Sequence, residues 1–135
     1  MSNAARAGIL ALLEVVPNLN VHDGEVDTDE EAKVIVADLP YAVVYFGPGF
    51  PNPNERLCAS RPPAVVTFTV GNVGERVQQT LWVVDKTRGA LERVRWSGSL
   101  IRLVDSDPAP RRDDTYTRPG GGSLFYVGDR YEMAL

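Results

Sequence analysis

A proline-rich stretch at residues 47–63 constrains the fold more than any other feature of this 135-residue chain. Proline fixes its own φ angle and has no backbone N–H, so the stretch is predicted to form neither helix nor strand. The runs on either side, residues 41–46 and 64–70, are rich in β-branched and aromatic residues and predict strands. A long irregular connection is uncommon inside a domain unless it has a function. Phe50 and Leu57 are therefore candidates for docking against a neighbour or, alternatively, for packing on the chain's own core.

Two segments have the periodicity of amphipathic helices. Near the start of the chain, apolar residues recur at helical spacing up to Pro17, which predicts a helix that ends before this proline. Gly71-Asn72 is expected to end the strand that precedes the second helix, which is predicted to run from about residue 74 to residue 91. The face of this second helix that is expected to be buried consists of Val77, Leu81, Val84, Arg88 and Leu91, with Arg88 as the exception to an apolar pattern.

The rest of the chain contains shorter β-rich runs. Residues 99–104 predict a strand, and residues 124–133 predict a final strand that is interrupted at Gly128-Asp129. Residues 107–122 are rich in proline, glycine and charge, and predict a loop. Because strands that are neighbours in sequence usually pair, we expect one α+β domain over residues 1–135. Its sheet is predicted to be mixed or antiparallel, with about four main strands and two helices packed on one face.

Negative charge is concentrated in one part of the sequence. The formal net charge is −4, and residues 23–38 hold seven acidic residues against one lysine. The most acidic part of this stretch contains Asp27, Asp29, Glu30 and Glu31. We interpret the stretch either as a solvated loop or as a negative surface that faces a partner or repels DNA. No basic cluster typical of a nucleic-acid-binding surface is seen, because Arg111-Arg112 is followed directly by Asp113-Asp114.

Residue types that serve catalysis are scarce. His22 and Cys58 are the only imidazole and thiol in the chain, and no known motif surrounds either residue. Carboxylate pairs such as Asp105 with Asp107 lie in or beside a polar loop. We therefore predict no catalytic residue, no cofactor, no metal site and no enzymatic activity. The sequence has no run of 18 apolar residues and no convincing secretory signal, so we expect no membrane span and synthesis in the cytoplasm.

Seven segments, taken in order and spacing, have a familiar pattern. They are the opening helix that ends at Pro17, LNVHDGEV at 19–26, PYAVVYFG at 40–47, VVTFTVG at 65–71, ERVQQTLWVVDKTRGAL at 75–91, IRLVDSDPAPRRDD at 101–114 and FYVGDRYEMAL at 125–135. Together they cover most of the chain, and the pattern resembles the tail terminator proteins of long-tailed, siphovirus-like bacteriophages. The acidic insertion at residues 27–38 is longer than this resemblance leads us to expect.

The resemblance implies a structural role in the virion, at the neck of the tail. Such a protein forms a six-fold ring that caps the head-proximal end of the tail tube, stops tube polymerisation and joins the tail to the head connector. DNA would pass through the ring without specific binding, and the acidic stretch would either line this channel or lie outside it. Within the ring, we expect pairing between subunits through Arg111, Arg112, Asp113 and Asp114. The stretch 47–63, with Phe50 and Leu57, is the candidate contact with the tail tube or connector.

Three other readings compete with a tail terminator. The nearest is another phage neck protein, such as a head-completion, stopper or connector subunit. A small enzyme that uses Cys58 or the loop carboxylates is more remote. A ligand-binding α+β module is equally remote, and ligand would raise its thermal stability.

Overall fold

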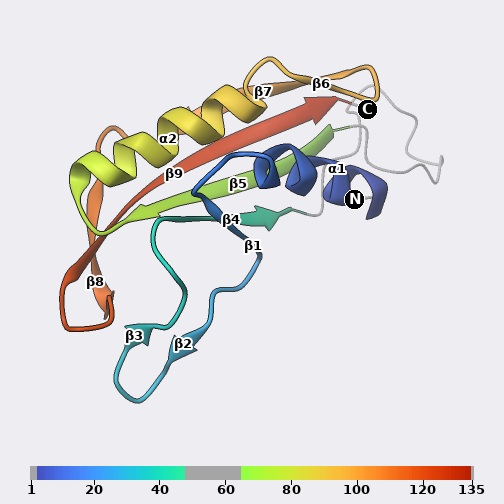
Figure 1. Ribbon diagram of the computed structural model, residues 1–135. Helices are drawn as coiled ribbons and strands as arrows, with labels where there is room; N and C mark the ends of the chain where they lie inside the picture. Colours follow the sequence, from blue (N-terminus) through green and yellow to red (C-terminus); the bar gives the residue numbers. More distant parts are fainter. Residues whose placement is uncertain (1–2, 48–64, 135) are drawn as a thin grey trace, which may run out of the picture.

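The computed structural model describes residues 3–47 and 65–134 (Figure 1). The elements in these ranges are α1 (Asn3–Glu14), β1 (Asn20–Asp23), β2 (Thr28–Asp29), β3 (Val34–Ile35), β4 (Tyr41–Phe46), β5 (Val65–Gly74), α2 (Val77–Leu91), β6 (Arg95–Trp96), β7 (Ser99–Ser106), β8 (Arg111–Thr117) and β9 (Ser123–Ala134). The predicted α+β class is confirmed. The prediction of about four main strands is wrong, because the described residues form nine.

The strands form one curled, mixed sheet in which β9 is the central member. One edge of β9 pairs with β5, which continues to β4 and β1, and β1 runs parallel to β4. The other edge is shared by two strands. β7 pairs with the later half of β9, where Ile101 lies opposite Met133, and β8 pairs with the earlier half, where Arg112 lies opposite Phe125. β3 and β2 extend the sheet beyond β8.

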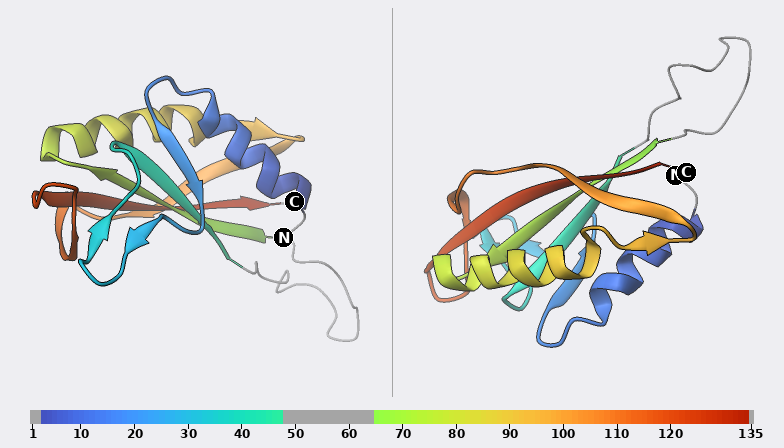
Figure 2. Two further views of the ribbon diagram at one scale, coloured as in Figure 1. Left: turned by 60° about the horizontal axis from the view of Figure 1, so that its bottom comes forward. Right: turned by 90° about the horizontal axis from the view of Figure 1, so that it is seen from above.

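Both helices cover the same face of the sheet, as predicted (Figures 1 and 2). Strand residues alternate between faces, so Ala42, Val44, Phe68 and Val70 point toward the helices and form the main core with them. Ile9 and Leu13 of α1, which belong to the predicted apolar stripe, are fully buried in this core. None of the described helices is long and apolar enough to cross a membrane.

The buried face of α2 differs from the prediction. Val77 and Leu81 are 43% and 48% exposed, whereas the helix buries Thr80, Val83, Val84, Thr87 and Leu91. The two threonines can be buried because each hydroxyl has partners: Thr80 Oγ1 donates to Phe125 O at 3.1 Å, and Thr87 Oγ1 to Asn72 Oδ1 at 2.6 Å. The prediction is therefore confirmed for Val84 and Leu91 and wrong for Val77 and Leu81, and it misses the two buried threonines.

Two predicted breaks in strands, an end at Gly71-Asn72 and an interruption at Gly128-Asp129, are wrong because pairing between distant strands accommodates these residues. β5 continues through Gly71-Asn72 to Gly74, and β9 is not interrupted at Gly128-Asp129. Gly71 and Gly128 are cross-strand partners, so the two residues without side chains face each other. The Asn72 side chain donates to Val127 O at 3.0 Å, which satisfies a buried amide within the sheet.

A buried ion pair joins α2 to β9. Asp129 is fully buried and receives two hydrogen bonds from Arg88, from Nε at 3.0 Å and from an Nη at 2.9 Å. Ser106 Oγ donates to the same carboxylate at 2.6 Å, and Asn72 Nδ2 lies 3.4 Å from it. The pKa of Arg88 is raised, mainly by its hydrogen bonds to Asp129. The charged residue that interrupts the apolar pattern of α2 is therefore held by an ionic partner on β9.

The acidic stretch and the predicted loop at 107–122 are also more regular than expected. The acidic stretch contains the short hairpin β2–β3, which lies on the side of the sheet away from the helices (Figures 1 and 2). β8 occupies the middle of the predicted loop. A second, smaller core lies beneath these strands and is built from Ile35, Tyr41, Val43, Val73 and Leu124. The face without helices is therefore partly covered, at one end, by the hairpin and β8.

Candidate functional site

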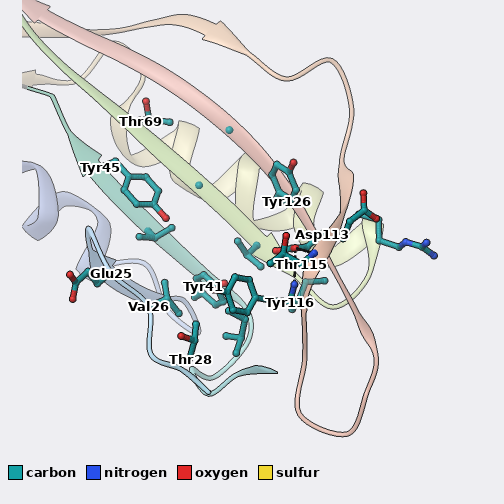
Figure 3. Close-up of a pocket in the computed structure, with 18 of the residues that line it drawn as sticks. Glu25, Val26, Thr28, Tyr41, Tyr45, Thr69, Asp113, Thr115, Tyr116 and Tyr126 are labelled. Atoms are coloured by element: carbon teal, nitrogen blue, oxygen red, sulfur yellow. Dashed lines mark hydrogen bonds between the residues drawn. The ribbon is translucent and has the colours of Figure 1, made fainter. Parts of the chain in front are cut away.

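A cleft of about 870 Å³ opens on the face of the sheet that the helices leave uncovered (Figure 3). Strands β4, β5 and β9 form its floor, and the β2–β3 hairpin and β8 form its walls. We call it the tyrosine cleft, after the four tyrosines in its lining: Tyr41, Tyr45, Tyr116 and Tyr126. Tyrosine is enriched at protein interfaces because a large apolar ring carries a polar tip.

The centre of the floor is bare backbone. Gly71 pairs with Val43 on one side and with Gly128 on the other. A Cβ at Gly71 would lie 3.0 Å from Val43 Cγ1, and one at Gly128 would lie 3.3 Å from Asp107 Oδ2. Because both positions are glycine, no side chain from them fills the space between Tyr45 on β4 and Tyr126 on β9 (Figure 3).

The tyrosine hydroxyls on the β4 side of the cleft are uncharged at neutral pH. Tyr41 is only 4% exposed, and burial, together with the nearby Tyr45 and Asp113, raises its pKa to about 12. Tyr45 is half exposed, and partial burial raises its pKa as well. Tyr45 can therefore offer an aromatic face and a neutral hydrogen bond to a bound group, while Tyr41 supports the floor from below.

Glu30 fastens the β2–β3 hairpin to β8. Its carboxylate accepts hydrogen bonds from Thr28 Oγ1 at 2.7 Å, from Lys33 Nζ at 3.0 Å and from the Tyr116 hydroxyl at 3.0 Å. These bonds, that from Thr28 first, lower the pKa of Glu30 to about 2. The pKa of Tyr116 is raised, chiefly by its bond to Glu30. The carboxylate therefore remains ionised at the wall of the cleft.

Three of the four residues predicted to pair between subunits lie in this cleft. Arg112, Asp113 and Asp114 belong to β8 and line the wall that this strand forms beside the hairpin. Asp113 Oδ1 accepts the backbone N–H groups of Thr115 at 2.8 Å and Tyr116 at 3.0 Å, which fixes its position. With Glu25 and Glu30, the lining carries four carboxylates and one guanidinium, so the cleft is acidic.

Arg111, the fourth of these residues, is not in the cleft lining. It is exposed, lies opposite Tyr126 on β9, and its guanidinium is 3.8 Å from an Asp107 carboxylate oxygen. Arg111 therefore has a partner within its own chain. The expected pairing of Arg111 between subunits stays a prediction.

The structure divides the other predicted residues into two groups. Asp27, Asp29 and Glu31 are exposed on the β2–β3 hairpin and do not line the cleft, unlike Glu30. Asp29 Oδ1 accepts the backbone N–H groups of Glu31 at 3.1 Å and Ala32 at 3.2 Å, which stabilises the turn. The predicted docking residues Phe50 and Leu57, together with Cys58, lie outside the described residues.

His22 lies on the edge strand β1. Its ring meets the Tyr41 ring edge-on, with the centroids 5.4 Å apart, and its Nε2 is buried without a hydrogen-bond partner. Among residues 3–47 and 65–134, no group of three or more His, Asp or Glu side chains is placed to hold a metal ion.

Sequence reasoning missed most of the cleft. In the sequence, Tyr41 and Tyr45 indicate only a strand, and Tyr126 only a part of the final strand. The signal that was available is their alternation: Tyr41, Val43 and Tyr45 share one face of β4, opposite the face that Ala42 and Val44 bury. The facing glycines on β5 and β9 depend on strand register, which spacing along the chain does not provide.

The chain matches no known protein-family model and shows no significant similarity to any curated protein. The geometry of the site must therefore carry the functional argument.

Proposed function

We propose that this chain is a structural subunit of a phage neck, a tail terminator that forms a ring on the head-proximal end of the tail tube. The observation that carries the proposal is the tyrosine cleft, a large concave surface on the uncovered face of the sheet. Its tyrosines and fixed carboxylates are the groups that a protein partner would contact. The sequence resemblance supplies the identity of the assembly, and the α+β fold agrees with it.

In this proposal the ring stops tube polymerisation and joins the tail to the head connector, with six subunits around a DNA channel. The partners are therefore further copies of this chain, the tail tube protein and the connector protein. Exposed carboxylates such as Asp27, Asp29 and Glu31 would repel DNA wherever they face the channel. No cofactor, metal or catalytic step is invoked.

Electron microscopy of particles assembled without this protein tests the proposal. Tails that overgrow to variable lengths and fail to join heads are the expected result. Tails of normal length beside filled, unattached heads would reassign the chain to another neck position, such as a stopper or connector subunit. Normal infectious particles would refute a structural role altogether.

A small-ligand module is the second candidate, and the size of the cleft favours it. A volume of about 870 Å³ lies within the usual range of small-molecule sites, about 300–1,000 Å³. This candidate predicts that a ligand raises the melting temperature by mass action, and that Gly71→Leu, which fills the floor of the cleft, abolishes the rise. A matched substitution outside the cleft, Gly89→Leu, should leave the rise intact.

A further inference from the structure

The surfaces near the two ends of β9 differ in charge. The start of β9 lies beside β8 and the tyrosine cleft, whose lining holds four carboxylates and one guanidinium. The end of β9 lies beside β7 and the β6–β7 hairpin, where Ile101 pairs with Met133. About ten residues of extended strand separate these ends, which places them roughly 30 Å apart. Figure 1 shows β8 and β6 at opposite ends of the molecule.

The positive end is built by arginines. Residues 93–104 contain Arg93, Arg95 and Arg102 and no acidic residue, and all three arginines are exposed. Glu132 of β9 lies opposite Arg102, so the three arginines outnumber the nearest carboxylates, Glu92 and Glu132, by one. Arg95 pairs across the hairpin with Leu100, and Arg102 lies two residues beyond Leu100 along β7. Alternation therefore puts Arg95 and Arg102 on the same face of the hairpin.

Packing and hydrogen bonding fix the position of the β6–β7 hairpin. Its Trp96 packs against Gly8 of α1 so closely that a Cβ at Gly8 would overlap the indole ring. At the turn, Arg95 donates to Gly98 O at 3.1 Å. Because the backbone of the hairpin is fixed in this way, its exposed arginines are presented at one end of the molecule.

We propose that the tyrosine cleft of one copy of this chain receives the β6–β7 hairpin of the next copy, with Arg95 and Arg102 entering the cleft. This proposal rests on the ring proposed above and names its subunit contact. The joined surfaces lie at opposite ends of the molecule, so the contact is head-to-tail, the type that builds either closed rings or open filaments, and the proposed ring requires the first. The cleft and the hairpin of one chain cannot meet, because the length of β9 separates them.

The chemistry of the cleft suits a guanidinium. Arginine stacks on aromatic rings, which Tyr45 and Tyr126 provide, and it forms paired hydrogen bonds with carboxylates. Asp113 is held in place by two backbone N–H groups, so it is a preorganised acceptor. The bare glycine floor leaves room for a flat group between the rings. The neighbouring copy would thus supply the counter-charges that the cleft lacks.

Charge reversal and exchange test this contact. Sedimentation velocity over a concentration series at low salt should show self-association of the wild-type chain. R95E/R102E should weaken it about tenfold or more, and so should E25R/D114R on the cleft side. All four residues are exposed, so the variants should keep the wild-type circular dichroism spectrum. R95E alone should also weaken association, and it avoids the like-charge pair that R102E forms with Glu132. The chain with all four substitutions exchanges the charges across the contact and should recover most of the affinity.

R76E/K86E is the matched control, because it changes the net charge as much as R95E/R102E but alters exposed residues of α2 and its N-terminal end. It should leave the association unchanged. Any of three results would refute the proposed contact. The wild-type chain stays monomeric at the highest concentration, the control variant weakens association equally, or the variant with all four substitutions shows no recovery of affinity. A chain that associates through these residues yet leaves tail length normal would keep the contact and refute only the terminator role.

Discussion

Substitution of the two partners in the Arg88–Asp129 ion pair should lower the free energy of unfolding by different amounts. The Asp129 side chain is fully buried, whereas that of Arg88 is 34% exposed. Removal of Arg88 therefore leaves a buried carboxylate with no cation, while removal of the charge on Asp129 leaves a guanidinium that can turn toward water. We expect the substitution of the more exposed partner to be the more harmful one.

The magnitudes follow from burial and hydrogen bonding. Arg88→Met strands Asp129 with only the weaker donors Ser106 and Asn72, and breaking a buried pair in this way costs about 3–5 kcal/mol in the free energy of unfolding. Asp129→Asn keeps the shape and loses charge-assisted hydrogen bonds, which costs about 1–3 kcal/mol. In the double variant the stranded charge is gone, so the two losses should not add, and the coupling should exceed about 1 kcal/mol.

Urea denaturation of the wild-type, both single variants and the double variant measures this cycle. The midpoint should fall most for Arg88→Met, at an unchanged dependence on urea concentration. Two results would refute the reasoning: a larger loss for Asp129→Asn than for Arg88→Met, or losses that add within about 0.5 kcal/mol.

Three further predictions concern pH and packing. Burial raises the pKa of Tyr41 from 10.0 to about 12, so its contribution to stability is complete below pH 10 and is lost as the pH rises, by about 3 kcal/mol once pH 12 is passed. Tyr41→Phe should reduce the alkaline loss in urea titrations without removing it, because burial also raises the pKa of Tyr131, and an unchanged loss would contradict the assignment. The pKa of Glu30 is lowered from 4.5 to about 2, so its contribution is present above pH 4.5 and is lost as the pH falls to 2; Glu30→Gln should reduce that acid dependence, and an unchanged profile would contradict the assignment. Gly8→Ala should destabilise the protein by about 1–3 kcal/mol because the new methyl overlaps Trp96, whereas Gly89→Ala, whose Cβ would meet no described atom within 4 Å, should stabilise α2 by about 0.5–1 kcal/mol; calorimetric melting of both variants tests this contrast.

The elements with strong local signals were predictable. Periodic apolar residues identified α1 and its buried Ile9 and Leu13, and β-branched runs identified β4 and β5. These features depend on neighbours in sequence, so one chain contains enough information to place them. The common location of both helices on one face followed from the need to bury their apolar sides.

The parts that were missed depend on partners far away in the sequence. α2 buries Thr80 and Thr87 because Phe125 and Asn72 accept their hydrogen bonds, and neither acceptor is visible from the helix pattern. β8 has the polar sequence of a loop and becomes a strand because β9 supplies an edge to pair with. The tyrosine cleft depends on local strand patterns and also on the pairing of distant strands. Only its β8 and β2–β3 walls therefore contain residues that the sequence predicts to be functional.

The central place of β9 also determines when the sheet can form. The ribosome makes β9 after every other strand, yet β5, β7 and β8 all depend on it as their partner. During synthesis, β4 can pair with β5 and β6 with β7, but the edges of β5, β7 and β8 that bind β9 stay unpaired until residues 123–134 emerge. The nascent chain therefore holds an unfinished sheet with open edges, which are the surfaces most prone to aggregation. Completion of the fold is postponed until the last strand leaves the exit tunnel, and chaperones would have their main opportunity to bind in this interval.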